Sequence, residues 1–204
     1  MTDTPLPRIA VVIPCYNSEA WIARTINSVL DQSYADRLVI VVDDGSRDAS
    51  ADRVRAFGDR VILHTGPNRG ACAARNTGMA IAAEQGATHV IFLDADDYLE
   101  GELLVGAAKV ATETGADIVL SDMHIVDAEG RRQARSVYSG SITPETFFEG
   151  WLNGLYFNPS SILWRIDFVQ RIGGCGCRQC QRSQAPTLLQ RMTRQREAND
   201  RDLR

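Results

Sequence analysis

Short apolar runs separated by helical patterns constrain the fold of this chain more than any other feature. Runs rich in Val, Ile and Leu recur at residues 9–13, 38–42, 61–64, 89–93 and 117–120, and we predict a strand at each. The first, second and fourth lack polar alternation, which is typical of strands buried on both faces of a parallel sheet. Because strands and helical patterns alternate, the sequence predicts an α/β layered fold with right-handed crossovers.

The segments between these strands carry helix signals. Asn17 or Ser18 can cap a first helix, and Ser46 can cap a second that runs to residue 57. A third helix is expected over residues 71–85, where small residues allow close approach to a sheet, and a fourth over residues 102–115. Each helix can therefore cross between two parallel strands.

After residue 120 the pattern changes. Residues 124–138 predict a hairpin with its turn at 127–130, and residues 143–152 predict a helix with Pro144 in its first turn. A strand at residues 160–164 then leads to a short helix that ends at Gly173 and Gly174.

Composition excludes several classes of protein. A formal net charge of −4 gives no basic footprint for nucleic acid. The first residues do not resemble a secretory signal, and no apolar run approaches the roughly 20 residues that span a bilayer. Five Cys, an odd number without a signal, favour reduced thiols. We therefore expect a soluble, cytoplasmic chain that does not bind nucleic acid.

The composition shifts after Gly174, which divides the chain into a domain at 1–174 and a tail at 175–204. The tail is rich in Arg and Gln and poor in large apolar residues, so we expect a solvated helix or a poorly packed segment. Its "CGCRQC" offers three Cys without a fourth ligand at suitable spacing, which disfavours a metal site there.

Three carboxylates follow the fourth predicted strand in "HVIFLDADDYLE": Asp94, Asp96 and Asp97. Like charges this close are unfavourable unless a cation or water screens them. In an open parallel sheet, ligands bind beyond the carboxyl ends of the strands, so the polar segments that end the first four strands should meet at one edge. No G-x-G-x-x-G follows the first strand and no P-loop motif is present, which disfavours a dehydrogenase and a P-loop enzyme.

Four ordered segments resemble the family-2 glycosyltransferases with the GT-A fold. They are "VVIPCYNSEAWIARTINSVLDQSY", "IVVDDGSRDAS", "NRGACAARNTGMA" and "FLDADDYL", and the likeness covers residues 8–174. The resemblance implies a Rossmann-like layered sandwich with a mostly parallel central sheet flanked by helices. It also implies a donor half at 1–100 and a partial acceptor half at 101–174.

The same resemblance implies a reaction. A sugar passes from a UDP- or GDP-linked donor to a hydroxyl of a glycan or lipid-linked acceptor, with inversion and with help from Mn²⁺ or Mg²⁺. Polysaccharide or cell-envelope glycan synthesis is the implied setting, which is consistent with peripheral association at the cytoplasmic face of the membrane.

The D-x-D of Asp94 and Asp96 suits a hard cation that prefers oxygen ligands and also takes diphosphate oxygens. We expect Asp96 to be the direct ligand and Asp94 to lie nearer the ribose or the metal. A lone D-x-D also occurs by chance, so this assignment depends on the other three segments.

Further donor-site residues follow from the resemblance. Asp43 is the expected partner of the base N–H, with Asp44 nearby, and a loop that includes Pro14, Tyr16 and Asn17 should wall the base. Arg69 and Arg75 are expected to meet phosphate charge, Arg69 in preference because it lies in a loop. The alternatives are structural: "DDGS" is also an ordinary capped turn, Tyr16 could pack, and Arg75 could pair with an acid.

The general base is where the sequence departs from the family pattern. The resemblance implies a Phe-Asp turn after the Gly pair, but "RIGG" is followed here by "CGCRQC". Near the end, "ANDRDLR" resembles the family's acidic pattern and would make Asp200 the base. The alternative is a catalytically incomplete nucleotide-sugar-binding module, truncated or altered in reading frame after Gly174.

Overall fold

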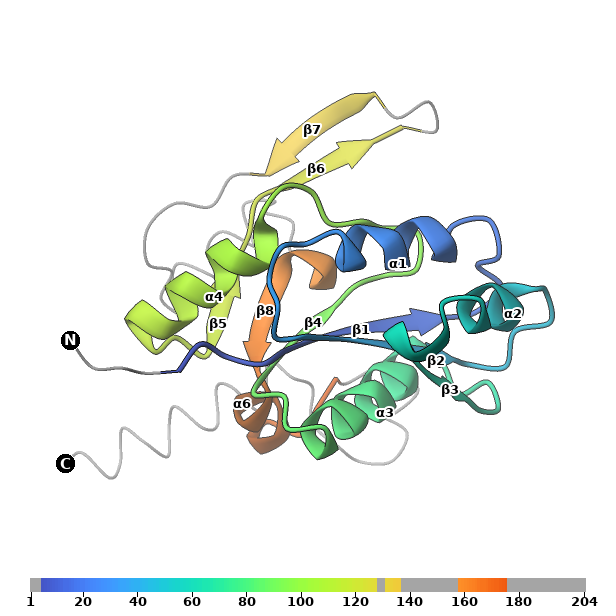
Figure 1. Ribbon diagram of the computed structural model, residues 1–204, viewed down its shortest axis with the longest axis horizontal. Coiled ribbons are helices and arrows are strands. Elements are labelled where there is room, and N and C mark those ends of the chain that lie inside the picture. The colour runs from blue at the N-terminus through green and yellow to red at the C-terminus, as the bar shows by residue number, and fades with distance from the viewer. Residues whose placement is uncertain (1–4, 128–130, 137–157, 176–204) are drawn as a thin grey trace.

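The computed structural model of the protein describes residues 5–127, 131–136 and 158–175 (Figure 1). Within them, a six-stranded sheet has the order β3-β2-β1-β4-β8-β5, and β6 and β7 form a separate two-stranded sheet. The strands of the large sheet are β1 (Ile9–Cys15), β2 (Arg37–Asp43), β3 (Ile62–Thr65), β4 (His89–Phe92), β5 (Ile118–Leu120) and β8 (Ile162–Arg165). The predicted α/β fold with a mostly parallel sheet is confirmed.

One strand runs against the others. β8 lies between β4 and β5 and pairs antiparallel with both, whereas β1 pairs parallel with β2 and with β4. The strand predicted at residues 160–164 therefore enters the middle of the sheet, and it joins the second half of the chain to the first.

Helices cover both faces of the sheet (Figure 1). One face carries α1 (Ile22–Leu30), α2 (Ser50–Arg55) and α4 (Leu103–Thr114), and the other carries α3 (Ala71–Glu84) and α6 (Ile166–Arg171). Successive β1 side chains point to opposite faces, so Ile9, Val11 and Ile13 join one apolar cluster while Ala10 and Val12 join the other. All five are fully buried, as expected for a strand without polar alternation.

The third helix approaches the sheet closely at a glycine. A Cβ placed on Gly78 would lie 2.3 Å from Val12 Cγ1 and 3.2 Å from Val42 Cγ2. The expectation that small residues in this helix permit close packing is met most clearly here.

The residues that were predicted to cap the first two helices form bonds between two loops instead. α1 begins at Ile22 and α2 at Ser50, each several residues after its expected cap. Asn17 has a positive φ of 50°, its backbone N–H donates to Ser46 Oγ at 3.0 Å, and its Oδ1 accepts from Arg47 N at 2.8 Å. These polar side chains cross-link two loops instead of starting helices.

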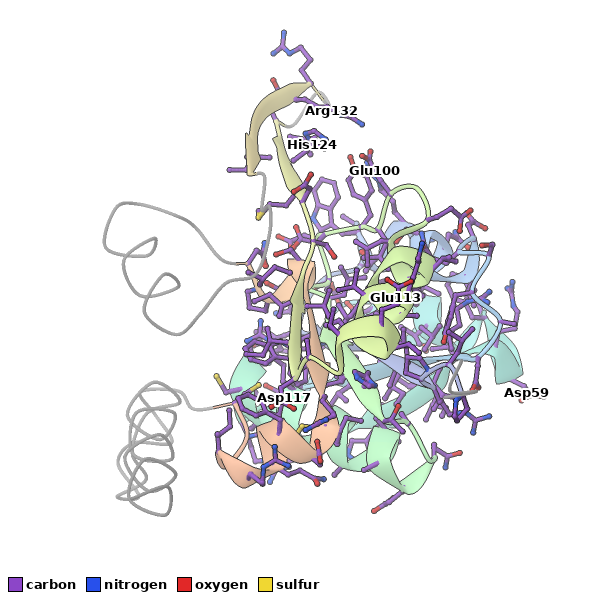
Figure 2. The ribbon with its side chains drawn as sticks, turned by 90° about the vertical axis from the view of Figure 1, so that its left-hand side faces the viewer. Asp59, Glu100, Glu113, Asp117, His124 and Arg132 are labelled. Atoms are coloured by element: carbon purple, nitrogen blue, oxygen red, sulfur yellow. The ribbon has the colours of Figure 1, made fainter. Side chains whose placement is uncertain are left out.

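The hairpin of β6 (Met123–Val126) and β7 (Arg132–Ser136) projects from the body (Figure 1). Arg132, the first residue of β7 after the turn, pairs with Glu100 at 2.9 Å, and Figure 2 shows both residues with His124. Two short 3-10 helices, η1 (Gly58–Arg60) and η2 (Pro159–Ser161), complete the described elements.

Two predicted segments, the helix at 143–152 and the tail from residue 176, lie outside the described residues. Within the described ranges, no helix has the length and apolar character needed to cross a membrane.

Candidate functional site

The ends of three neighbouring parallel strands form one edge of the sheet. β1 lies between β2 and β4, and Cys15 at the end of β1 is in register with Asp43 at the end of β2. Asp44 N donates to Cys15 O at 2.8 Å, and Leu93 N donates to Val12 O at 3.0 Å. The loop after β1, the acidic pair after β2 and the D-x-D after β4 therefore emerge side by side.

The acidic pair after β2 is buried, and its two members differ in their contacts. Asp44 accepts hydrogen bonds from Arg69 N at 2.9 Å and Gly70 N at 2.7 Å, so its carboxylate closes the start of α3. From the described residues, the carboxylate of Asp43 receives a single long bond, 3.4 Å from Ser46 N to Oδ1. Asp43 is the member with acceptor capacity left for a ligand, whereas Asp44 is occupied by the loop that carries Arg69.

The loop after β1 is held by the loop after β2. Ser18 N donates to Ser50 Oγ at 2.8 Å and Glu19 N donates to Asp48 Oδ2 at 3.0 Å, in addition to the bonds of Asn17. Pro14 lies within β1, half-buried, while Tyr16 is exposed at 46%. A rigid loop thus presents the Tyr16 ring to solvent beside Asp43.

The first acid of the D-x-D forms an ion pair. Asp94 Oδ1 lies 2.5 Å from Arg75 Nη2 on α3, and the Arg75 side chain is only 15% exposed. Burial acts to lower the pKa of Arg75, but the Asp94 carboxylate outweighs it and the pKa is raised. Arg75 therefore stays charged at this edge, while Arg69 is exposed on its loop.

The third acid of the cluster is tied to the second half of the chain. Ser160 Oγ donates to Asp97 Oδ2 at 2.5 Å, Asn158 Nδ2 donates to the same oxygen at 3.1 Å, and Asp94 N donates to Ser160 Oγ at 3.1 Å. Burial raises the pKa of Asp97, the Ser160 bond opposes this, and Asp94 and Asp96 add to the rise. Asp96 is exposed. A cation at this turn would relieve the repulsion among the three acids.

Polar side chains on the face of α1 that packs against the sheet form hydrogen bonds with the same turn. Thr25 is buried, and its Oγ1 lies 2.7 Å from Ala95 O and 2.8 Å from Asp97 O. Ser28 Oγ accepts from Leu99 N at 3.0 Å. We did not predict these contacts, nor those of Asn158 and Ser160. The sequence signal that could have indicated the Thr25 contacts was a Thr at an apolar position of an amphipathic helix.

Replacing Thr25 with Val should loosen this turn while keeping the volume of the side chain. Loss of the hydroxyl leaves the Ala95 and Asp97 carbonyls short of a donor, which costs about 1–3 kcal/mol of folding free energy. Urea unfolding measures that loss. Thr114→Val is the matched control, because among the described residues the hydroxyl of this exposed Thr bonds within α4 and the adjoining turn. Equal stability of the two variants would contradict the role given to Thr25.

The chain returns to this edge after α6. Asn76 Oδ1 accepts from Cys175 N at 2.8 Å, and Asn76 Nδ2 donates to Cys175 O at 3.1 Å. A Cβ on Gly174, which has a φ of +80°, would meet Asn76 Oδ1 at 2.7 Å, so the glycine permits this contact. Burial raises the pKa of the Cys175 thiol to about 12, which keeps it protonated. Residue 175 is thus fixed beside Arg75 on α3.

The residues present fit a divalent cation only together with a phosphate ligand. Across the parts of the chain that the structure describes, no three His, Cys, Asp or Glu side chains are grouped to hold a metal. Mg²⁺ commonly takes one or two carboxylates and completes its shell with substrate phosphates and water. Asp96, exposed and next in the turn to Asp94, suits that smaller donor set. Asp200 lies outside the described residues, so its assignment stays a prediction.

Comparisons with curated proteins find glycosyltransferases. The chain is 30% identical over 149 residues to an uncharacterized glycosyltransferase of Haemophilus influenzae, covering 71% of this chain and 58% of that protein. It is 32% identical over 120 residues to glycosyltransferase GlyA of Streptococcus pneumoniae, covering 57% and 17%. It is also 32% identical over 130 residues to a poly(ribitol-phosphate) beta-glucosyltransferase of Bacillus spizizenii, covering 60% and 20%. The chain thus spans less than two thirds of the length of these relatives.

Solved structures show the same architecture. S. aureus TarS 1–349 in complex with UDP-GlcNAc matches with a TM-score of 0.65 and 25% identity, covering 80% of this chain and 46% of that one. The mannosyltransferase PcManGT of Pyrobaculum calidifontis, in complex with GDP-Man and Mn²⁺, shares the fold with a TM-score of 0.61 and 21% identity, covering 85% and 48%. The model of the family described as "Glycosyl transferase family 2" matches residues 10–173. The chain belongs to glycosyl transferase family 2.

Proposed function

We propose that the protein moves a sugar from a UDP- or GDP-linked donor to an acceptor hydroxyl, with inversion at the anomeric carbon and with help from a divalent cation. The observation that carries the proposal is the shared strand edge. It holds the buried Asp43 and the exposed Tyr16 at one end and the carboxylates of Asp94 and Asp96 at the other. This arrangement matches a ligand with a base at one end and a diphosphate at the other.

The nucleoside would bind where β1 and β2 end. Asp43 has an acceptor oxygen without a short hydrogen bond, which suits a ring N–H of the base. Tyr16 offers an aromatic face on a loop that several hydrogen bonds hold in place, so stacking would cost little conformational entropy. Pro14 and Asn17 shape the same wall.

The diphosphate would lie over the end of β4. Arg75 and the exposed Arg69 supply positive charge there, and Arg donates in a geometry that suits phosphate. Asp96, with Asp94, would hold Mn²⁺ or Mg²⁺, which supplies charge stabilisation for the leaving nucleotide diphosphate when bound. Asp97 and Ser160 would keep the turn in the geometry that binding of the cation requires.

Transfer forms a bond from the acceptor oxygen to the anomeric carbon and breaks the bond to the diphosphate oxygen. The hydroxyl proton passes to a general base, for which Asp200 remains the predicted residue. The names of relatives that act on poly(ribitol-phosphate) or take part in teichuronic acid and succinoglycan biosynthesis support an envelope or extracellular glycan as the acceptor. Such an acceptor would bring the protein to the cytoplasmic face of the membrane.

Titration of UDP and GDP by calorimetry, with and without Mn²⁺, tests the proposal. Asp43→Asn should weaken binding of the preferred nucleotide about 10- to 100-fold, since a hydrogen bond to a charged group contributes about 1.5–3 kcal/mol. Asp59→Asn is the matched control, because Asp59 is an exposed acid on η1, an element that carries no proposed site residue (Figure 2).

A turnover assay separates the two interpretations of the chain. Binding accompanied by donor hydrolysis or transfer supports the enzyme. Binding without any turnover supports the nucleotide-sugar-binding module instead. Absence of UDP and GDP binding in the unmodified protein would remove both.

A further inference from the structure

We propose that Trp21, together with the stacked pair Arg24 and Tyr98, forms a platform that binds an acceptor sugar bearing a phosphate or carboxylate group. The inference rests on the proposed function, because it assigns an acceptor to the transferase site. None of these three residues belongs to the proposed donor or metal site. Together they form the acceptor platform.

The first member stands at the edge that carries the D-x-D. Trp21 is the N-cap residue of α1, its side chain is 50% exposed, and its carbonyl accepts from Thr25 N at 3.1 Å. Residues three and four positions apart on a helix are neighbours on its surface, so Arg24 and Thr25 both adjoin Trp21. Since Thr25 contacts the carbonyls of Ala95 and Asp97, the start of α1, which carries Trp21, lies beside the proposed metal-binding turn.

The second and third members connect α1 to that turn directly. The Arg24 guanidinium carbon lies 3.8 Å from the centre of the Tyr98 ring, and Tyr98 follows Asp97 in the chain. Stacking uses the face of the guanidinium, so its N–H groups, which lie in the plane, remain available to a ligand. Arg24 makes no ion pair with any residue in the described ranges.

The three residue types indicate a binding surface. Trp, Tyr and Arg are the residues most enriched among those that dominate binding energy, and the indole offers a large, rigid, amphipathic surface. The apolar face of a sugar ring fits such a flat surface, while its hydroxyls remain free to bond with water or with the site.

Charge decides the class of acceptor. The turn beside the platform carries Asp96 and Asp97, whose carboxylates would repel an anionic acceptor. Arg24, stacked on Tyr98, places a positive charge beside this turn, and Arg donates to phosphate or carboxylate in a bidentate manner. The platform therefore suits a glycan with an anionic group next to the ring that receives the new sugar.

The experiment uses the full chain loaded with UDP and Mn²⁺ and a printed panel of neutral, phosphorylated and uronic-acid oligosaccharides. The unmodified protein should bind anionic members at least tenfold more strongly than neutral ones. Trp21→Ala should weaken binding to all members about tenfold or more, and Trp21→Phe should restore part of it. Arg24→Gln should weaken only the anionic members, and separate phosphate and uronate arms identify which anion is preferred.

Controls keep the outcomes distinct. Val105→Ala, another exposed apolar side chain, on α4, should leave panel binding unchanged. UDP affinity should be the same in all these variants. A Trp21→Ala protein that binds the panel normally, or that loses UDP affinity instead, overturns the platform, as does an unmodified UDP-bound protein that recognises no panel member. Failure of the unmodified protein to bind UDP or GDP counts against the proposed function itself.

Discussion

Asp96→Asn is expected to lower the rate of sugar transfer, or of donor hydrolysis, about 100- to 1,000-fold, the effect of removing one group that stabilises transition-state charge. Asparagine keeps the size of the side chain but removes the negative charge that a hard cation prefers. Because Asp96 is exposed, the fold should not change. The measurement is release of UDP or GDP over a range of Mn²⁺ concentrations.

The control for Asp96 is a nearby acid with another task. Glu100→Gln removes the same charge four residues later, where the side chain pairs with Arg132 at 2.9 Å, and it should leave the rate within a small factor of the original. Thermal melting of both variants confirms that each is folded. If Asp96→Asn and Glu100→Gln turn over equally fast, the metal assignment is wrong.

Gly78→Ala is expected to have the largest effect on stability. The new methyl group would lie 2.3 Å from Val12 Cγ1, in the buried contact between α3 and the central strand β1. Overpacking of this kind costs about 1–3 kcal/mol or more, which corresponds to a fall in Tm of several degrees for a chain of this size. Differential scanning calorimetry measures the shift.

The fold supplies a matched control and a rescue for this variant. Gly106→Ala on α4 places a methyl group where no atom lies within 4 Å, so it should stabilise the protein by about 0.5–1 kcal/mol through helix propensity. Combining Gly78→Ala with Val12→Ala should cost less than the sum of the two single changes, because the smaller strand residue makes room. Strict additivity would show that α3 does not pack on β1 as described.

The sheet and its helices could be predicted because their signals are local. A β-branched run such as the one from Ile9 identifies a buried strand, and a glycine such as Gly115, at φ 65°, ends a helix as expected. The position of β8 could not be predicted, since its short apolar run does not reveal which strands it will pair with. The parallel order of the first strands explains why their polar ends were correctly expected at one edge.

The contacts that position the D-x-D were beyond sequence reasoning for a different reason. Asp97 depends on Asn158 and Ser160, more than sixty positions further along the chain, and such pairings leave no local pattern. The prediction that Asn17 and Ser46 cap helices was wrong, because the same polar chemistry serves a helix cap or a bond between loops. Only the packing of β1 against β2 decides between these uses.

The antiparallel strand β8 also determines where the chain could be cut into pieces that fold. A protein cut after residue 100 would keep every proposed donor residue, yet the free side of β4 would be left without β8, and the Ser160 hydroxyl would be missing from Asp94 N and Asp97. Such a piece would present bare strand backbone to other molecules and would tend to self-associate. Exchange of segments between members of the family should therefore succeed only at junctions beyond β8.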